Sequence, residues 1–140
     1  MRYVVTGGAG FIGSHYVRSL LDGSLGADVE GVRVLDKLTY AGNMANLASV
    51  SDDPRYSFVQ GDICDGALLD EVLPGHDVVV NFAAETHVDR SLTDPVPFVR
   101  NNVAVTLTML EYARQVQPSR CRPLTRQRMS SRRSCAMSPG

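Results

Sequence analysis

The sequence predicts an α/β fold, in which helices cover both faces of a doubly wound parallel sheet. Three observations indicate this. Short β-branched runs alternate with segments of helical periodicity, and a glycine-rich turn separates the first such run from the first helical segment. A continuous apolar run, DVVVNF at residues 77–82, is typical of a strand that is buried on both faces of a parallel sheet.

The predicted elements alternate strictly between strand and helix along the chain. The strands are residues 2–6, 31–35, 56–60 and 77–82, and the helices are residues 11–21, 43–50, 67–73 and 97–116. The strand ranges are short and rich in Val, Tyr and Phe, whereas the first and last helical ranges repeat apolar residues at a spacing of three and four. Asp22 and Gly23 end the first helix, and Pro74 and Gly75 end the third.

The composition is that of an ordinary globular domain. Of the 140 residues, 44% are hydrophobic and 21% are charged, so we expect one domain with a real core. No apolar run approaches the roughly 20 residues of a membrane span, and glycines interrupt the N-terminal apolar run where a signal peptide would need its apolar centre. Three cysteines without zinc-type spacing predict reduced thiols and no metal site. These features together predict a soluble cytoplasmic protein.

Charge is distributed unevenly along the chain. All 15 acidic residues lie at or before Glu111, whereas six of the 14 basic residues are arginines within residues 119–140. That segment also contains five serines and has scarcely any apolar periodicity, a composition typical of unstructured chain. We therefore predict an α/β portion at residues 1–118 and an Arg/Ser-rich tail at residues 119–140. For this tail, we favour the hypothesis that the reading frame is lost near Ser119. The alternative is a genuine basic tail that binds a polyanion, but we expect no nucleic-acid partner.

The stretch TGGAGFIGS, residues 6–14, carries the main functional signal. Gly8, Gly10 and Gly13 fit the spacing GxGxxG, and Gly7 with the last two fits GxxGxxG, directly between a predicted strand and a predicted helix. Glycines in such a turn let the backbone approach a pyrophosphate, and the helix N-terminus offers it unpaired N–H groups. The stretch therefore predicts a Rossmann-type dinucleotide-binding turn.

Asp36 ends the second predicted strand, 23 residues beyond Gly13. A carboxylate at this place accepts hydrogen bonds from a ribose 2′-hydroxyl and repels a 2′-phosphate, which favours NAD over NADP. The adjacent Lys37 weakens that preference with its positive charge. The structural alternative for Asp36 is a turn or helix-capping aspartate.

Five segments together resemble the dTDP-glucose 4,6-dehydratases, within the extended short-chain dehydrogenase/reductase superfamily. They are TGGAGFIGSH, VLDKLTYAGN, GDICD, NFAAETHVDRS and PFVRNNVAVT, and the resemblance covers about residues 1–116. The first motif is shared by the whole superfamily, whereas DKLTYAGN together with HVDRS is specific to this dehydratase group. The resemblance implies an NAD-dependent lyase that converts dTDP-glucose to dTDP-4-keto-6-deoxyglucose and water, and a homodimer.

The resemblance also implies roles for individual residues. The expected cofactor-binding residues follow the first four strands or belong to a later helix: Gly7, Gly10, Phe11, Ile12, Gly13, Asp36, Lys37, Leu38, Thr39, Asp62, Ile63, Phe82, Ala83, Ala84, Glu85, Thr86 and Asn101. The polar cluster after the fourth strand is the expected substrate region, with Thr86, His87 and Arg90. Alternatives stay open: Asp62 could cap the next helix, a role that Asp65 could also fill, and the two alanines could be plain packing residues.

Several family features are replaced or absent in this sequence. Thr86 stands where the family usually has Ser, Asn101 where it commonly has Thr, and Val105 where it has Gly. The resemblance implies a catalytic Tyr in a YxxxK motif and a Thr-Asp-Glu set, but Lys37 is the only lysine and neither motif occurs. We therefore assign no catalytic residue and expect an inactive N-terminal NAD-binding portion. A fragment of a nucleotide-sugar epimerase or decarboxylase, or a non-catalytic NAD-binding protein with a basic interaction tail, is the alternative.

The predicted strand at residues 77–82 has no predicted neighbour on one side. In the family a fifth strand follows it, whereas this sequence continues into the Arg/Ser-rich segment. An apolar strand at an open sheet edge promotes association with other chains, so we expect poor solubility.

Overall fold

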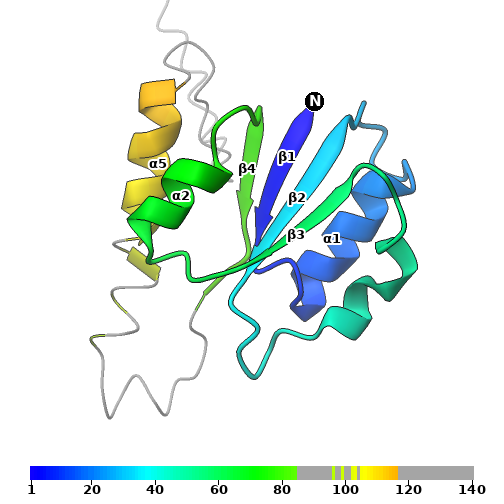
Figure 1. Cartoon of the computed structure of the whole chain (residues 1–140), viewed down its shortest axis with the longest axis horizontal. Coiled ribbons are helices and arrows are strands. Elements are labelled where there is room, and N and C mark those ends of the chain that lie inside the picture. The colour runs from blue at the N-terminus through cyan, green and yellow to red at the C-terminus, as the bar shows by residue number, and fades with distance from the viewer. Residues whose placement is uncertain (85–95, 97–98, 100–101, 104, 117–140) are drawn as a thin grey trace, which may run out of the picture.

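The structure is a parallel four-stranded sheet between two layers of helices (Figure 1). The computed structural model describes residues 1–84, 96, 99, 102–103 and 105–116. Its elements are β1 (Arg2–Thr6), α1 (Phe11–Leu21), β2 (Gly31–Asp36), the 3₁₀ helix η1 (Met44–Val50), β3 (Tyr56–Gln60), α2 (Gly66–Val72), β4 (Val78–Asn81) and α5 (Val105–Val116). The strand order is β3-β2-β1-β4, so the predicted α/β fold of Rossmann type is confirmed.

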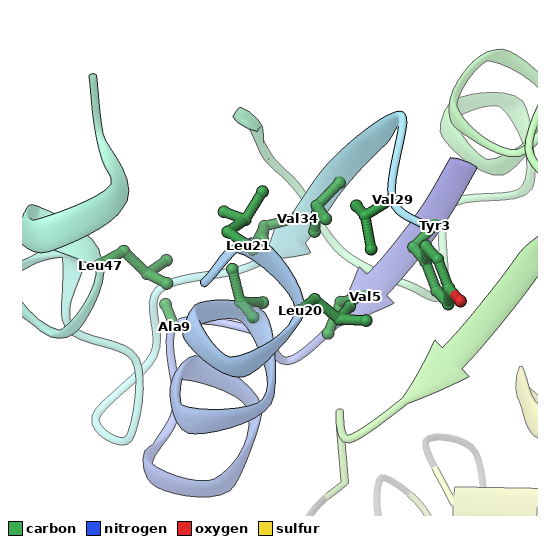
Figure 2. Close-up of a cluster of buried hydrophobic side chains, with 10 residues drawn as sticks. Tyr3, Val5, Ala9, Leu20, Leu21, Val29, Val34 and Leu47 are labelled. Carbon is green, nitrogen blue, oxygen red and sulfur yellow. The ribbon is translucent and has the colours of Figure 1, made fainter. Parts of the chain in front are cut away.

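Alternate residues of the strands pack against opposite helical layers. Tyr3 and Val5 of β1 belong to a buried cluster that includes Leu20 of α1 and Leu47 of η1 (Figure 2). Val4, which lies between them in sequence, belongs to a second cluster on the other face. This alternation follows from the two-residue period of a strand, so a continuous apolar run can serve both faces of the sheet.

The second cluster joins the sheet to α2 and α5. Val4 and Leu35 contribute from the strands, and Leu69 and Val72 contribute from α2. Met109 of α5 is buried in the same cluster. Figure 1 shows α2 and α5 together on this face, opposite α1. The sheet is therefore covered on both faces, as the alternating pattern predicts.

The element boundaries agree with the predictions to within one or two residues where the chain is described, with two differences. The predicted helix at residues 43–50 is a 3₁₀ helix, which begins after Asn43, whose side-chain oxygen accepts the Ala45 N–H (2.9 Å). The prediction of a last helix from residue 97 is borne out over α5, and most residues between 97 and 104 lie outside the described part. The tail at residues 119–140 also lies outside it, so the proposed boundary stays a prediction.

Among the residues that the structure describes, β4 lies at the edge of the sheet, as predicted from the missing neighbour of residues 77–82. Val78 and Val80 pack against one buried cluster and Val79 packs against the other, so the strand contacts both helical layers as predicted, but the three valines are only half-buried. Val4 and Val5 of the neighbouring β1 are completely buried. The difference arises because, in the described part of the chain, only β1 pairs with β4. The poor solubility expected of such an edge stays a prediction.

The strand register brings four chain turns to one edge of the sheet. Thr6 pairs with Leu35 and Asn81, and Asp36 pairs with Gln60, so the parallel strands end at nearly the same level. Ligands of open α/β sheets bind outside this carboxyl edge, and the predicted site residues follow these strand ends. Within the described residues, no helix combines the length and the apolar character needed to cross a membrane.

Candidate functional site

The glycine turn connects β1 to α1 and lies against the end of β4. The Gly7 N–H donates to the Leu35 carbonyl (2.9 Å), and Gly7 has a φ of +67°, a conformation that favours glycine. A Cβ on Gly7 would lie 2.5 Å from the backbone nitrogen of Ala83. A Cβ on Gly13 would overlap the Gly7 carbonyl oxygen. Both positions therefore require glycine for close approach of the strand, helix and turn backbones.

The N-terminus of α1 is open toward the same edge. Gly10 caps the helix without a side-chain hydrogen bond, and the first turn contains no acidic residue. The side chains of Phe11 and Ile12 are 90% and 66% exposed, so this end of the helix is not covered by other described residues. The first N–H groups of a helix carry a partial positive charge and bind anions such as phosphate. The arrangement can hold a pyrophosphate.

Three hydrogen bonds hold the backbone of Ala9, which lies within the glycine turn. Its N–H donates to Asp36 Oδ2 (2.9 Å), and its carbonyl oxygen accepts from the Asn43 N–H (3.1 Å) and from Asn46 Nδ2 (2.9 Å). Ala9 is completely buried. Asn43 and Asn46 therefore fix the turn from the segment after β2. Sequence reasoning missed this role, although Asn43 belongs to the quoted motif VLDKLTYAGN and Asn46 lies three residues beyond it.

Asp36 connects the glycine turn to the end of β2. It is 8% exposed, and its Oδ1 accepts the Leu38 N–H (2.8 Å) while its Oδ2 accepts the Ala9 N–H. Leu38 has a φ of +56°, an uncommon conformation for a residue with a Cβ. A Cβ on Gly42 would lie 2.8 Å from Asp36 Oδ1, so glycine leaves room for the carboxylate. Each oxygen keeps a further lone pair for a ligand hydroxyl.

Lys37 and Asp62 form an ion pair between the loops that follow β2 and β3. Lys37 Nζ lies 2.7 Å from Asp62 Oδ2, and Asp62 Oδ1 accepts the Cys64 N–H (2.9 Å). Asp65, rather than Asp62, caps α2, because its side chain accepts the N–H groups of the first turn. Asp62 is therefore held by Lys37 and Cys64 at the carboxyl edge and not by the first turn of α2. Ile63 differs from it, since its side chain is buried in the cluster beneath α2.

The ion pair affects the acid titration of Asp62. Partial burial raises the pKa of this carboxyl group, but hydrogen bonds from Lys37 and Cys64 outweigh burial and lower the pKa below its ordinary value of 3.8. A carboxyl group with a lowered pKa stabilises the fold above its unfolded-state pKa, and this contribution is lost as the pH falls through the folded-state pKa.

We expect the Asp62→Asn chain to lose less stability than the unaltered chain when the pH is lowered from about 5 to about 2. The difference should be below about 1 kcal/mol, because the pair is largely exposed to solvent. Urea unfolding at a series of pH values measures it. Parallel pH profiles of the two chains would contradict the role given to the pair.

Phe82, Ala83 and Ala84 continue from β4 past the glycine turn. The ring of Phe82 contacts the ring of Tyr16 on α1, with centroids 5.3 Å apart. Asn81 Oδ1 accepts from the Ala83 N–H (3.2 Å) and from the Thr6 hydroxyl group (2.5 Å), which ties the ends of β1 and β4 together. These contacts place residues 82–84 beside Gly7, at the same edge as Asp36.

The structure thus brings together most of the predicted cofactor residues. Thr39 completes the segment after β2, where its carbonyl oxygen accepts the Gly42 N–H (3.1 Å). The remaining predicted residues, for both cofactor and substrate, lie outside the described part of the chain: Glu85, Thr86, His87, Arg90 and Asn101. In the part that is described, no group of His, Cys, Asp and Glu side chains could hold a metal ion.

Comparison with known proteins agrees with this geometry. The profile of the GDP-mannose 4,6 dehydratase family matches residues 4–130. The chain belongs to this family. Among curated members, the dTDP-glucose 4,6-dehydratase of Streptomyces niveus is 57% identical over 114 residues, which are 81% of this chain and 34% of that protein. The resemblance to dTDP-glucose 4,6-dehydratases is confirmed, and the chain spans about a third of the length of such relatives.

Solved structures of family relatives have the same fold. DesIV, a dTDP-glucose 4,6-dehydratase from Streptomyces venezuelae solved with NAD bound, is 55% identical with a TM-score of 0.78, and the match covers 83% of this chain and 36% of that one. A UDP-N-acetylglucosamine 4-epimerase from Methanobrevibacter ruminantium is 31% identical with a TM-score of 0.71, and the match covers 83% of this chain and 34% of that one. The fold is thus shared by dehydratases and epimerases, but the identity is higher with the dehydratase.

Proposed function

We propose that this chain is the NAD-binding part of a dTDP-glucose 4,6-dehydratase. The observation that carries the proposal is the glycine turn, which lies between the open N-terminus of α1 and the buried carboxylate of Asp36. Gly7 and Gly13 let the strand, turn and helix backbones pack closely, which is the role of glycines that hold a dinucleotide-binding turn in place. The residues present therefore fit a dinucleotide.

Each part of the carboxyl edge would bind a different part of the cofactor. The first turn of α1 would bind the pyrophosphate through its N–H groups, and Asp36 would accept the adenosine ribose hydroxyl groups. Asp62 and the backbone of Ile63 would flank the adenine, and residues 82–86 would lie along the nicotinamide half. When bound, NAD supplies a reversible hydride acceptor, whereas this chain supplies binding and orientation.

We further propose that residues 1–118 bind NAD without turning over dTDP-glucose. Proton transfer at neutral pH needs a group whose pKa is shifted toward that pH, such as a Tyr beside a Lys. The sequence contains no YxxxK motif, because its only lysine is Lys37. Thr86 would contact the sugar of the nucleotide-sugar substrate, as the resemblance implies, and His87 and Arg90 would belong to the same substrate-binding loop.

The higher identity to dehydratases supports this reaction class over epimerisation. The chain is 55% identical to the solved dehydratase and 31% identical to the solved epimerase, over nearly equal shares of the chain. DKLTYAGN and HVDRS, the segments specific to the dehydratase group, are both present. A nucleotide-sugar lyase is therefore the reaction to which this NAD site would contribute.

The proposal predicts that NAD binds to the 140-residue chain and stabilises it. At an NAD concentration of about 100 times the Kd, the free energy of unfolding should rise by about 2.7 kcal/mol. Thermal unfolding with and without NAD measures the rise, and nicotinamide mononucleotide, which lacks the adenosine half, is the control that should bind weakly. Absence of any NAD-dependent shift would contradict NAD binding, and conversion of dTDP-glucose by the chain would contradict the absence of catalytic residues.

A further inference from the structure

Two neighbouring residues at the end of β2 favour opposite cofactors. In dinucleotide-binding folds, a carboxylate at this place binds the unmodified ribose of NAD, whereas a nearby basic residue accommodates the 2′-phosphate of NADP. Asp36 and Lys37 supply both kinds of charge at adjacent positions. Lys37 therefore weakens the preference for NAD that Asp36 alone predicts.

The structure gives these two side chains different surroundings. Asp36 is buried, and two backbone N–H groups fix its carboxylate. Lys37 is 60% exposed, and its Nζ lies 2.7 Å from Asp62 Oδ2 in the loop after β3. Asp62 is itself oriented by the Cys64 N–H at 2.9 Å. The cation that could attract a 2′-phosphate is thus paired with a carboxylate from the neighbouring loop.

We propose that Asp62 determines the preference for NAD over NADP by neutralising Lys37, an inference that rests on the proposed NAD-binding function. With all three side chains ionised, Asp36, Lys37 and Asp62 carry a net charge of −1, which repels the phosphate dianion. Removing the charge of Asp62 makes the net charge zero. It also releases a lysine ammonium group, which is a suitable donor to a phosphate.

The test is the ratio of the Kd for NADP to the Kd for NAD, measured by titration calorimetry on the 140-residue chain. The Asp62→Asn variant should lower this ratio about fivefold, the upper end of the contribution of an exposed charge pair. The ratio is the readout because a lost contact to the adenine would weaken both cofactors alike. Adding Lys37→Gln to Asp62→Asn restores a net charge of −1 and should return the ratio to that of the unaltered chain.

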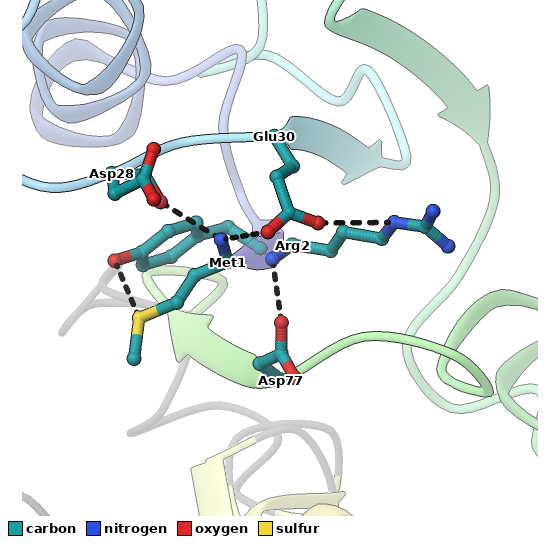
Figure 3. Close-up of polar contacts among 6 residues, drawn as sticks. Met1, Arg2, Asp28, Glu30 and Asp77 are labelled. Atoms are coloured by element: carbon teal, nitrogen blue, oxygen red, sulfur yellow. Dashed lines mark hydrogen bonds and ion pairs between the residues drawn. The ribbon is translucent and has the colours of Figure 1, made fainter.

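A matched control removes an ion pair from the opposite edge of the sheet. Glu30 lies 3.0 Å from the Met1 amino group and 3.9 Å from Arg2 Nε, where β1 and β2 begin (Figure 3). Glu30→Gln changes the net charge of the protein as Asp62→Asn does, but it should leave the Kd ratio unchanged. An equal fall of the ratio in both variants would overturn the local role of Asp62.

The two proposals fail in different ways. If the unaltered chain binds no NAD, the proposed function is wrong, and the inference falls with it. If NAD binds but Asp62→Asn leaves the ratio unchanged, the inference alone is wrong. If the double variant keeps the lowered ratio of the single variant, the effect does not act through Lys37, and the inference is again wrong.

Discussion

Replacement of Gly13 by alanine is expected to distort the glycine turn and abolish NAD binding. The new Cβ would overlap the Gly7 carbonyl oxygen and lie 2.8 Å from the Gly8 Cα. Both contacts are backbone atoms of a turn whose Ala9 is held by three hydrogen bonds, so the turn cannot move without breaking them. Overpacking of this kind costs about 1–3 kcal/mol, which urea unfolding would measure, with NAD binding followed by calorimetry.

Gly66→Ala is the matched control for this substitution. Nothing lies within 4 Å of a Cβ at Gly66, which begins α2, so alanine meets no obstacle there. Alanine also favours the helix and restricts the unfolded chain, and we expect a stability gain of up to about 1 kcal/mol with unchanged NAD binding. If the Gly13→Ala variant were as stable as the Gly66→Ala variant and bound NAD as tightly, the close packing of the turn against α1 would be unnecessary for the site.

The sequence predicts the alternation of strands and helices because local signals bound each element. The strands β1, β2 and β3 are apolar runs that end at glycines or aspartates, and the structure reproduces their limits nearly residue for residue. The burial of β4 could not be predicted in this way. The open edge itself follows from the order of the predicted elements, but the extent of burial depends on what packs beside the strand, and three valines in a row do not reveal it.

The candidate site was predictable only in its glycine turn and its carboxylates. The spacing of the glycines and Asp36 reflects a local strand, turn and helix, so the sequence reveals it. The contacts that complete the site join residues far apart in the chain, namely Asp36 with Ala9, Asn46 with Ala9 and Lys37 with Asp62. These pairs are separated by 25 to 37 positions, and only the register of the parallel strands brings them together.

Asp36→Asn is expected to weaken both the fold and NAD binding. The carboxylate accepts two backbone N–H groups, one on each oxygen, from Ala9 and Leu38. An asparagine has one acceptor oxygen, and its amide nitrogen would face the other N–H group donor to donor. A buried donor without a partner costs about 1–3 kcal/mol, so the free energy of unfolding should fall by that amount. NAD binding should weaken more than about tenfold, because the turn and a ribose acceptor are affected together.

Asp77→Asn separates this effect from the simple loss of a carboxylate. Asp77 Oδ2 accepts the Arg2 N–H (2.8 Å) at the exposed opposite edge of the sheet (Figure 3), and an asparagine oxygen can accept that same single bond. We expect a change within about 0.5 kcal/mol and unaltered NAD affinity. Equal unfolding free energies for the two variants would show that the paired N–H groups do not hold the glycine turn. If Asp36→Asn lost stability but kept its NAD affinity, Asp36 would be a support for the turn and not a ribose ligand.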